Sequence, residues 1–432
     1  MSEAPYSTAG LDDYRALIGN RAVERVRRRG ALLAGLRVLH VNATLIGGGV
    51  SEMLFSLIPL MRDAGLSVDW YVLDGDDPFF QVTKSMHNAL QGGRQRWLHR
   101  YLDVYRDGNA RNASMLASRM GRYDVVIVHD PQPLALRSMF PAHQGTWFWR
   151  CHIDLTEPNR RWWTALAPFL RPYDQAIFST PEYVPQGLQV RAETALPCID
   201  PFRAKNRDLE PGTIERVQRR YGLDPDRPVM LQVSRFDPWK DPLGVLEAYR
   251  IVKRERPGLQ LAYMASMASD DPEGRAVYER VREAAGDDPD VHLLALDVPA
   301  DQVDENALEV NAMQRGADVV LQKSIREGFG LTVTEALWKE KPVVAGNVGG
   351  IRYQIEDGRN GYLVDDVPAA ADRVLRILDD RDAAAELGRR GHETVRDRFL
   401  MTRLLEQYFD WFEAHARERH EVLHPVRGVR SA

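Results

Sequence analysis

The sequence has very little cysteine and no cluster of residues typical of a metal site. Its 432 residues include only two cysteines, Cys151 and Cys198, and they form no CxxC pair. Two isolated thiols fit a reducing compartment, where we do not expect them to form a disulfide.

A broad positive charge and a long hydrophobic run are also missing. The formal net charge is −5, which argues against bulk binding of nucleic acid. No apolar run approaches the roughly 18 residues that a membrane span needs. The first residues lack the basic-then-apolar order of a signal peptide. We therefore expect a soluble cytoplasmic protein with no nucleic-acid or membrane partner.

The sequence does contain a regular alternation of apolar strand patterns and helical patterns. This alternation predicts mostly parallel sheets with helices on both faces. In the first half, strands are expected at 36–41, 68–73, 125–129, 146–150 and 175–178. In the second half, they are expected at 228–233, 259–264, 291–294, 318–322 and 342–345. Helices are expected at 11–34, 51–64, 243–255, 332–339 and 383–417, the last interrupted near Phe399.

The pattern restarts after a charged, proline-containing segment at 196–227, which reads as a linker. We therefore expect an α/β protein with two doubly wound, Rossmann-like domains facing a deep cleft, where ligands bind at the carboxyl ends of the strands. The expected parts are a helical extension (1–35), an N-terminal domain (36–210), a C-terminal domain (211–395) and a helical segment (396–432) that packs back toward the N-terminal domain.

The most informative motif places two carboxylates, Glu327 and Glu335, eight residues apart around a Gly-Phe-Gly turn. The turn lies at a predicted strand-to-helix junction, where glycines let a ligand approach the backbone and the exposed amides favour an anion. This geometry suits a sugar nucleotide. The alternative is an ordinary turn with two solvated glutamates.

A second motif places two cations, Arg235 and Lys240, just after the first strand of the second half. An arginine fork and a lysine charge at a strand end can clamp a pyrophosphate leaving group. A pair of surface cations is the alternative, but the nearby glutamate motif favours the clamp.

In the first half, three segments at predicted strand ends offer weaker signals. The turn Gly47 to Gly49 opens a helix and fits a backbone loop that closes over a sugar or its phosphate, or else a tight structural turn. His152 can bind sugar hydroxyls or serve as a buried structural histidine. Asp130 can position an acceptor or simply cap a turn.

Three further patterns carry less weight. The segment 74–77 resembles the D-x-D pair that holds Mg²⁺ in some sugar transferases, but an acidic turn explains it better. Ser179 and Ser234 lack the flanking glycines of a nucleophile elbow, so serine hydrolysis is not supported. Four arginines between 25 and 29 suggest either an acidic partner or a solvated helix face.

Taken together, these motifs resemble the retaining GT-B glycosyltransferases of family 4. The resemblance rests on E-x7-E (Glu327, Glu335), S-R-x4-K (Ser234 to Lys240) and the glycine turn, and it extends from about Leu36 onward. Within this family the chain looks most like the trehalose glycosyltransferring synthases. That closer likeness rests on HVNAT (40–44), FFQVTK (79–84), WRCHIDLT (149–156) and LQKSIRE (321–327).

The resemblance implies a role for each motif residue. Arg235 and Lys240 would hold the diphosphate of the donor, with the amides around Gly330, Leu331 and Thr332. Glu335 would bind the ribose, and Glu327 the donor glucose near its 3- and 4-hydroxyls. His152 would contact the 6-hydroxyl region, and Gly48 and Gly49 would cover the phosphates. The acceptor-side candidates are Asp130, Lys84, His87 and Asn88.

The implied reaction transfers glucose from UDP-, ADP- or GDP-glucose to free glucose, with retention at the anomeric carbon, and gives α,α-1,1-trehalose. The resemblance implies no required cofactor; Mg²⁺ is compatible but not essential, and a homodimer is left open. One alternative keeps the donor and changes the acceptor to another sugar, a sugar phosphate or a polyol. Another, of a different class, is a regulator that binds sugar nucleotides without turnover.

Overall fold

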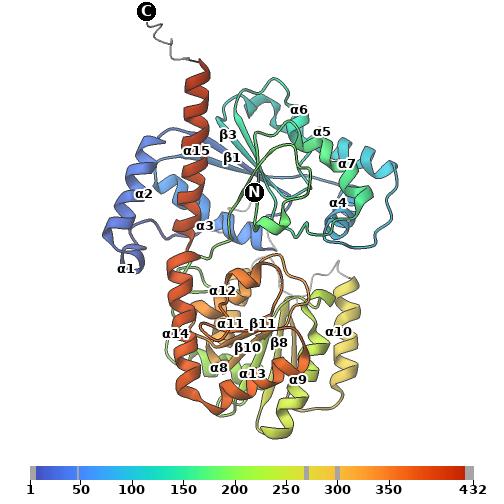
Figure 1. Ribbon diagram of the computed structural model, residues 1–432, viewed down its shortest axis with the longest axis vertical. Coiled ribbons are helices and arrows are strands. Elements are labelled where there is room, and N and C mark those ends of the chain that lie inside the picture. The colour runs from blue at the N-terminus through green and yellow to red at the C-terminus, as the bar shows by residue number, and fades with distance from the viewer. Residues whose placement is uncertain (1–5, 46–47, 267–271, 297–301, 424–432) are drawn as a thin grey trace, which may run out of the picture. The chain divides into compact units, whose positions relative to one another are not determined.

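A computed structural model of the protein describes residues 6–45, 48–266, 272–296 and 302–423. The chain forms two units (Figure 1). Unit 1 comprises Met1–Pro197 and Met401–Ala432, and unit 2 comprises Cys198–Leu400. In the part of the chain that is described, no helix is both long and apolar enough to cross a bilayer.

Unit 1 contains a six-stranded parallel sheet in the order β2-β1-β3-β4-β5-β6. Its strands are β1 (Arg37–Asn42), β2 (Ser67–Val72), β3 (Val125–His129), β4 (Thr146–Arg150), β5 (Gln175–Phe178) and β6 (Arg191–Thr194). Its helices are α1 (Arg15–Ile18), α2 (Asn20–Leu32), α3 (Gly49–Asp63), α4 (Asp77–Leu90), α5 (Arg100–Met120), α6 (Leu136–Met139), α7 (Arg160–Leu170) and α15 (Met401–Leu423). The strand order reverses between β1 and β3, so the loops after these strands diverge at a topological switch point.

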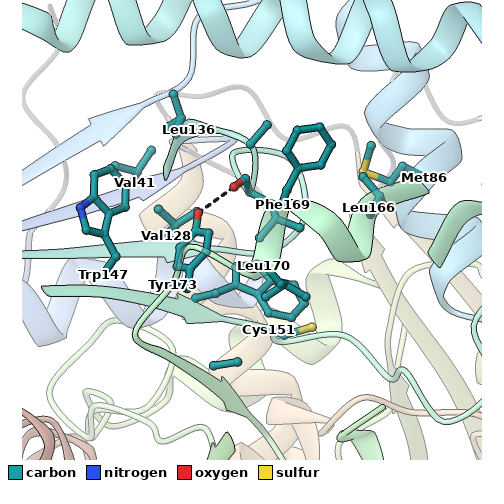
Figure 2. Close-up of a cluster of buried hydrophobic side chains, with 14 of the residues drawn as sticks. Val41, Met86, Val128, Leu136, Trp147, Cys151, Leu166, Phe169, Leu170 and Tyr173 are labelled. Atoms are coloured by element: carbon teal, nitrogen blue, oxygen red, sulfur yellow. Dashed lines mark hydrogen bonds between the residues drawn. The ribbon is translucent and has the colours of Figure 1, made fainter. Parts of the chain in front are cut away.

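The two faces of this sheet bury different side chains, because successive strand residues point to opposite sides. On one face, residues such as Val41, Val128 and Trp147 join a core that also includes Leu166 and Phe169 of α7 (Figure 2). The other face is covered by the C-terminal helix α15. There the Phe148 ring of β4 lies 6.0 Å from that of Phe412 and 5.1 Å from that of His415.

Helix α15 also binds the arginine cluster of α2, beside which it runs (Figure 1, red and dark blue). Arg25 Nε donates to Glu406 at 2.7 Å. Arg29 pairs with Asp410 at 2.7 Å and with Glu413 at 2.8 Å. Because Arg25 and Arg29 find carboxylates within unit 1, they need no external acidic partner.

Unit 2 contains a second six-stranded parallel sheet, in the order β12-β11-β10-β7-β8-β9. Its strands are β7 (Val229–Val233), β8 (Gln260–Ser266), β9 (Val291–Leu296), β10 (Val319–Gln322), β11 (Val343–Gly346) and β12 (Tyr362–Val364). Its helices are α8 (Thr213–Arg220), α9 (Pro242–Glu255), α10 (Pro272–Ala285), α11 (Val303–Gly316), α12 (Leu331–Trp338), α13 (Val367–Asp379) and α14 (Arg381–Arg398). Helix α9 contacts α10 and α13, while α8 contacts α11 and α12 contacts α14. The order reverses between β7 and β10, the two strands that precede the cation and glutamate motifs.

All ten strands expected from the sequence are present, each within two residues of its predicted ends. The sequence reading missed β6 and β12, which lie at the edges of their sheets. Both are short, and only one of their seven residues, Val364, is fully buried, so neither shows the continuous apolar run of a central strand. The units divide at Cys198, within the segment read as a linker. The more detailed domain boundaries at 35, 210 and 395 stay a prediction.

Candidate active site

The two motifs of unit 2 lie at the carboxyl ends of neighbouring strands. Arg235 and Lys240 follow β7, and Glu327 and Gly330 follow β10. The backbone joins the two loops, because Ile325 N donates to Trp239 O at 2.9 Å. The parallel sheet therefore brings together segments that are about ninety residues apart in the chain.

Lys240 and Glu327 form a direct ion pair at this edge. Lys240 Nζ donates to Glu327 Oε2 at 2.5 Å. Ser324 Oγ donates to the same oxygen at 3.2 Å. Only 9% of the Glu327 side chain is exposed, so the ammonium and the hydroxyl replace solvent around a largely buried carboxylate.

Arg235 lies on the same loop in a more open position. Its side chain is 62% exposed, and its guanidinium lies 3.7 Å from the Asp237 carboxylate. Gln232 of β7 fixes this loop, because its Nε2 donates to Lys240 O at 2.8 Å. The loop thus carries an exposed guanidinium and a half-buried ammonium, two kinds of cation that can bind an anion.

The turn before α12 requires glycine at position 330. Gly330 is the N-cap of α12 with φ 86° and ψ 64°, a left-handed conformation. A Cβ there would lie 3.2 Å from Glu327 Cγ. The first amides of α12, at Leu331 and Thr332, have no partner within their own helix and carry the positive end of its dipole. This places an anion-binding helix start directly against Glu327.

Gln354, which the sequence reading did not single out, fixes this turn. Its Nε2 donates to Phe329 O at 2.6 Å, and its Oε1 accepts from Thr334 Oγ1 at 2.6 Å. One buried amide therefore ties the turn to the helix that follows. Its position 24 residues after the turn gives no sequence signal for this role.

Glu335 is buried within α12, with 2% of its side chain exposed. Lys205 Nζ lies 3.4 Å from Glu335 Oε1. Lys339 donates to Glu335 O at 3.1 Å and to Gln314 Oε1 at 2.8 Å, and burial lowers the pKa of Lys339 to about 7. The sequence analysis singled out neither lysine, although Lys339 lies one helical turn after Glu335.

In unit 1, the glycine turn follows β1 at the switch point of the sheet. Gly48 is the N-cap of α3 with φ 131°, and Gly49 begins the helix. Ser51 Oγ donates to Thr44 O at 2.8 Å, which ties the helix start back to the strand end. Gly47, the first glycine of the predicted turn, lies outside the described residues.

His152 follows β4 and forms one end of a row of three histidines. Its Nε2 lies 3.0 Å from His129 Nδ1, and His129 Nε2 lies 2.9 Å from His40 Nδ1. Burial lowers the pKa of all three imidazoles, that of His40 to about 3. The sequence reading singled out only His152 of this row.

Asp130, the acceptor-side candidate after β3, holds the loop of His152. Its Oδ1 accepts from His152 N at 2.8 Å, and its own φ is 63°, a left-handed value that is rare outside glycine. Burial raises the pKa of Asp130 to about 6. The sequence left two interpretations of Asp130, which were acceptor positioning and turn capping. The contacts in the structure are those of a turn-forming residue.

The other acceptor-side candidates share a face of α4. Lys84, His87 and Asn88 are spaced three and four residues apart, which places them on neighbouring turns. Lys84 is exposed, and His87 and Asn88 are half-buried. Asp76, from the segment that resembled a D-x-D pair, caps this helix by accepting from Phe79 N at 3.0 Å and pairs with Arg111 at 3.0 Å.

A surface pocket of about 510 Å³ lies elsewhere in unit 2, between the 3-10 turn Gly349–Tyr353 and α14. Its lining includes Arg352, Glu356, Arg390 and Glu393, and none of the predicted site residues. The charges there are mixed, so we do not assign the pocket to the candidate site.

The structure thus forms two groups, each within its own unit. Unit 2 joins Lys240, Glu327 and Gly330 in direct contact, with Arg235 on the same loop as Lys240. In unit 1, His152 and Asp130 meet across the ends of β3 and β4.

Comparisons with known proteins cover both units. Residues 40–185 match the family described as trehalose synthase, N-terminal domain, and residues 213–394 match glycosyl transferases group 1. Among solved structures, a sucrose-phosphate synthase from Thermosynechococcus elongatus has a TM-score of 0.65 at 17% identity, over 88% of this chain and 100% of its own. This likeness confirms the expected GT-B fold.

Two relatives are much more similar in sequence. A trehalose synthase from Thermococcus litoralis is 44% identical over 402 residues, which is 93% of this chain and 96% of the relative. One from Rubrobacter xylanophilus is 46% identical over 398 residues, which is 91% of this chain and 94% of the relative. Identity of this extent confirms the resemblance drawn from the motifs: the chain belongs to the trehalose synthase family of GT-B glycosyltransferases.

Proposed function

We propose that this protein transfers glucose from a nucleoside-diphosphate glucose to free glucose and releases α,α-1,1-trehalose and the nucleoside diphosphate. The observation that carries this proposal is the 44% identity with a trehalose synthase over 93% of the chain. Since the identity spans acceptor-side as well as donor-side segments, it supports the whole reaction rather than the fold alone.

The donor diphosphate is assigned to the edge of the unit 2 sheet. Arg235 and Lys240 supply two cations, and the first amides of α12 at Gly330, Leu331 and Thr332 supply hydrogen-bond donors. A diphosphate carries more negative charge than the Glu327 carboxylate. We therefore expect Lys240 Nζ to exchange Glu327 Oε2 for a phosphate oxygen when the donor binds.

That exchange gives Glu327 its role. Once Lys240 turns to the phosphate, the Glu327 carboxylate regains acceptor capacity and can bind the 3- and 4-hydroxyls of the donor glucose. Glu335 is assigned to the ribose, where Lys205, now 3.4 Å from its Oε1, would orient it. His152 is assigned to the 6-hydroxyl region, and Gly48 and Gly49 to covering the phosphates.

The chemistry proposed is attack on the same face of the sugar from which the phosphate leaves. The bond between the anomeric carbon and the phosphate oxygen breaks, the bond to the acceptor hydroxyl forms, and the hydroxyl proton passes to the leaving phosphate. The configuration is retained, and no protein nucleophile is needed. The protein contributes positioning and stabilisation of the charge that develops on the phosphate.

This scheme requires no cofactor. Arg235, Lys240 and the helix start neutralise the leaving group, a task that Mg²⁺ performs in other phosphate chemistry. Mg²⁺ can accompany the nucleotide without being essential. We accordingly expect EDTA to leave the initial rate unchanged.

A neutral acceptor is favoured over a sugar phosphate. Among the four acceptor-side candidates, Asp130 is acidic, and Lys84 is the one lysine or arginine. One exposed lysine makes a poor site for a phosphate dianion, which usually takes arginine pairs or several amides.

A matrix of donors and acceptors tests the proposal. UDP-, ADP- and GDP-glucose would each be incubated with glucose, glucose 6-phosphate, fructose and glycerol, with released nucleotide and product linkage read by chromatography and NMR. An α,α-1,1-linked disaccharide from free glucose is the expected product. A product formed only with another acceptor would discard trehalose synthesis and keep the glucosyltransferase. Nucleotide binding without any product would point to a regulator.

A further inference from the structure

The three histidines of unit 1 form a continuous hydrogen-bonded row. His40 lies on β1, His129 at the end of β3 and His152 just after β4, which are three neighbouring strands. The ring centroids are 5.2 Å and 5.3 Å apart, and the ring planes differ by only 21° and 16°. The rings are therefore nearly coplanar and are joined edge to edge, nitrogen to nitrogen.

Burying these imidazoles in the sheet costs free energy of folding. His40 and His129 are buried positions in strands that are otherwise apolar, and an imidazole there gives up its hydration. Leucine or phenylalanine would fill the same space without polar atoms. Since the hydrogen bonds only offset the loss of water, stability alone gives no reason for three histidines.

The number of protons in the row limits it to two patterns. Each imidazole is neutral, because burial lowers the pKa of all three, and a neutral imidazole carries one N–H. Each of the two bridges uses one proton. The third proton then lies either on His152 Nδ1 or on His40 Nε2, and both bridges point the same way in each pattern.

The two end atoms decide between the patterns. His152 Nδ1 and His40 Nε2 are buried and have no hydrogen-bond partner within the described ranges. The His40 ring lies 6.1 Å from the Tyr408 ring of α15 between centroids, so this end of the row lies inside the protein. A buried N–H without an acceptor is rarer in proteins than a buried acceptor without a donor. We therefore assign the proton to the His152 end, because His152 follows β4 at the carboxyl edge of the sheet, where ligands of such folds bind.

We propose that His40 and His129 are positioning residues that fix the tautomer of His152, so that His152 offers an Nδ1–H donor to an oxygen of the bound sugar. This inference rests on the proposed function for the identity of the ligand. The ligand class follows from the donor: an uncharged sugar oxygen accepts the hydrogen bond, whereas an ammonium group in its place has only protons to offer and is rejected.

Nitrogen-15 NMR of the histidine-labelled full chain tests the tautomer directly. His143 is an internal reference for the opposite tautomer. Trp147 Nε1 donates to His143 Nδ1 at 2.9 Å, and His143 Nε2 lies 3.0 Å from Met120 O. His143 must therefore carry its proton on Nε2. We expect His152, assigned from the spectrum of His152→Ala, to show the reverse pattern, with Nδ1 protonated. A His152 spectrum like that of His143 would overturn the proposal.

Variants of His129 test the role of the row. His129→Phe fills the ring space but breaks both bridges, so His152 should become a mixture of tautomers and kcat/KM for the donor should fall about five- to tenfold, the value of one hydrogen bond. In His129→Asn, the amide nitrogen replaces Nδ1 and can still donate to His152, so the Nδ1–H signal and most of kcat/KM should return. Unchanged His152 signals and kcat/KM in His129→Phe would refute the role.

If His129→Phe does not fold, His40→Phe replaces it, because it removes the closed end of the row and leaves the bridge to His152. The spectrum of His152 in His40→Phe should again show both tautomers. A spectrum identical to that of the wild type would refute the positioning role. The spectra also separate this inference from the proposed function. Failure to make trehalose with His152 still protonated at Nδ1 would reject the reaction and not the row.

Discussion

The ion pair between Lys240 and Glu327 joins the two motifs that we assign to the donor site. Their side chains come from loops that follow neighbouring strands, and they meet at 2.5 Å although they are 87 residues apart in the chain. The pair keeps the ammonium at the point where the leaving phosphate is expected. It also gives a largely buried carboxylate a cationic partner.

Replacing Lys240 with alanine should mainly affect turnover. Lys240→Ala removes a charged donor to the leaving group, and losing one such donor costs about 10²-fold in kcat. The measurement is the steady-state rate with saturating donor and glucose. Lys253→Ala is a matched control, because Lys253 also forms a 2.5 Å ion pair, with Asp290, but lies in the last turn of α9, whereas Lys240 precedes the start of that helix. A folded Lys240→Ala with the turnover of the control would reject the clamp.

Glu335 should act on nucleotide binding. Glu335→Gln removes the negative charge from the hydrogen bond to the ribose, so we expect about 10-fold or weaker binding of the nucleoside diphosphate. Isothermal titration calorimetry measures this affinity. Glu309→Gln controls for the loss of a buried carboxylate, since Glu309 accepts from Arg220 at 2.6 Å in the same unit. Equal affinities in the two variants would show that the ribose contact is wrong.

At the scale of elements, the site depends on where strands end and helices begin. Both sheets reverse their strand order at one point, between β1 and β3 in unit 1 and between β7 and β10 in unit 2. Each predicted motif lies on a loop that leaves the sheet at or beside that point. The crossover helices on opposite faces keep these loops apart, which leaves room for a ligand.

The start of α12 gives a prediction at this scale. Gly330→Ala forces a Cβ into a left-handed conformation, at a cost of about 1–2 kcal/mol in the free energy of unfolding. The new Cβ would also approach Glu327 to 3.2 Å, so kcat should fall as well. Urea unfolding and steady-state kinetics check the two effects. Gly258→Ala is the control, because a Cβ at Gly258 meets nothing within 4 Å. Equal stability and kcat in both variants would contradict the strained helix start.

At the scale of the whole molecule, the row of histidines should make unit 1 sensitive to acid. His40, His129 and His152 have folded-state pKa values below 6.5, so unfolding takes up protons once the pH falls below that value. Stability is therefore fully present above about pH 6.5 and is lost as the pH falls toward the folded-state values. Each histidine adds up to about 1.4 kcal/mol per pH unit.

Calorimetry between pH 5 and 7 measures this dependence. The melting temperature of the unit 1 transition should drop steeply below pH 6.5, and less steeply in His40→Phe, which takes up one proton fewer. His99→Gln removes an exposed histidine outside the row and should keep the larger slope. Identical slopes in wild type and His40→Phe would show that His40 is not buried in the neutral form.

The elements predicted best were those whose signal lies in a short stretch of the sequence. Residues 125–129 form a continuous apolar run with β-branched side chains, which indicates a strand covered on both faces, and β3 has those bounds. The interruption near Phe399 was likewise visible, and α14 ends at Arg398. The edge strand β6, with exposed Arg191, lacks such a run because half of its surroundings is solvent.

The sequence by itself determined the fold class and the family, and it contains the motifs that we propose for the donor site. Their signals are local: apolar periodicity, glycine turns, and charges at fixed spacing after a strand. The cleft expected between the domains stays a prediction. Only the tertiary structure decided which charges meet, such as Lys240 with Glu327 and Lys205 with Glu335. The row from His40 to His152 also depends on strand order, since its members are 89 and 23 residues apart. Strand order follows from long-range pairing, and no local pattern along the chain encodes it.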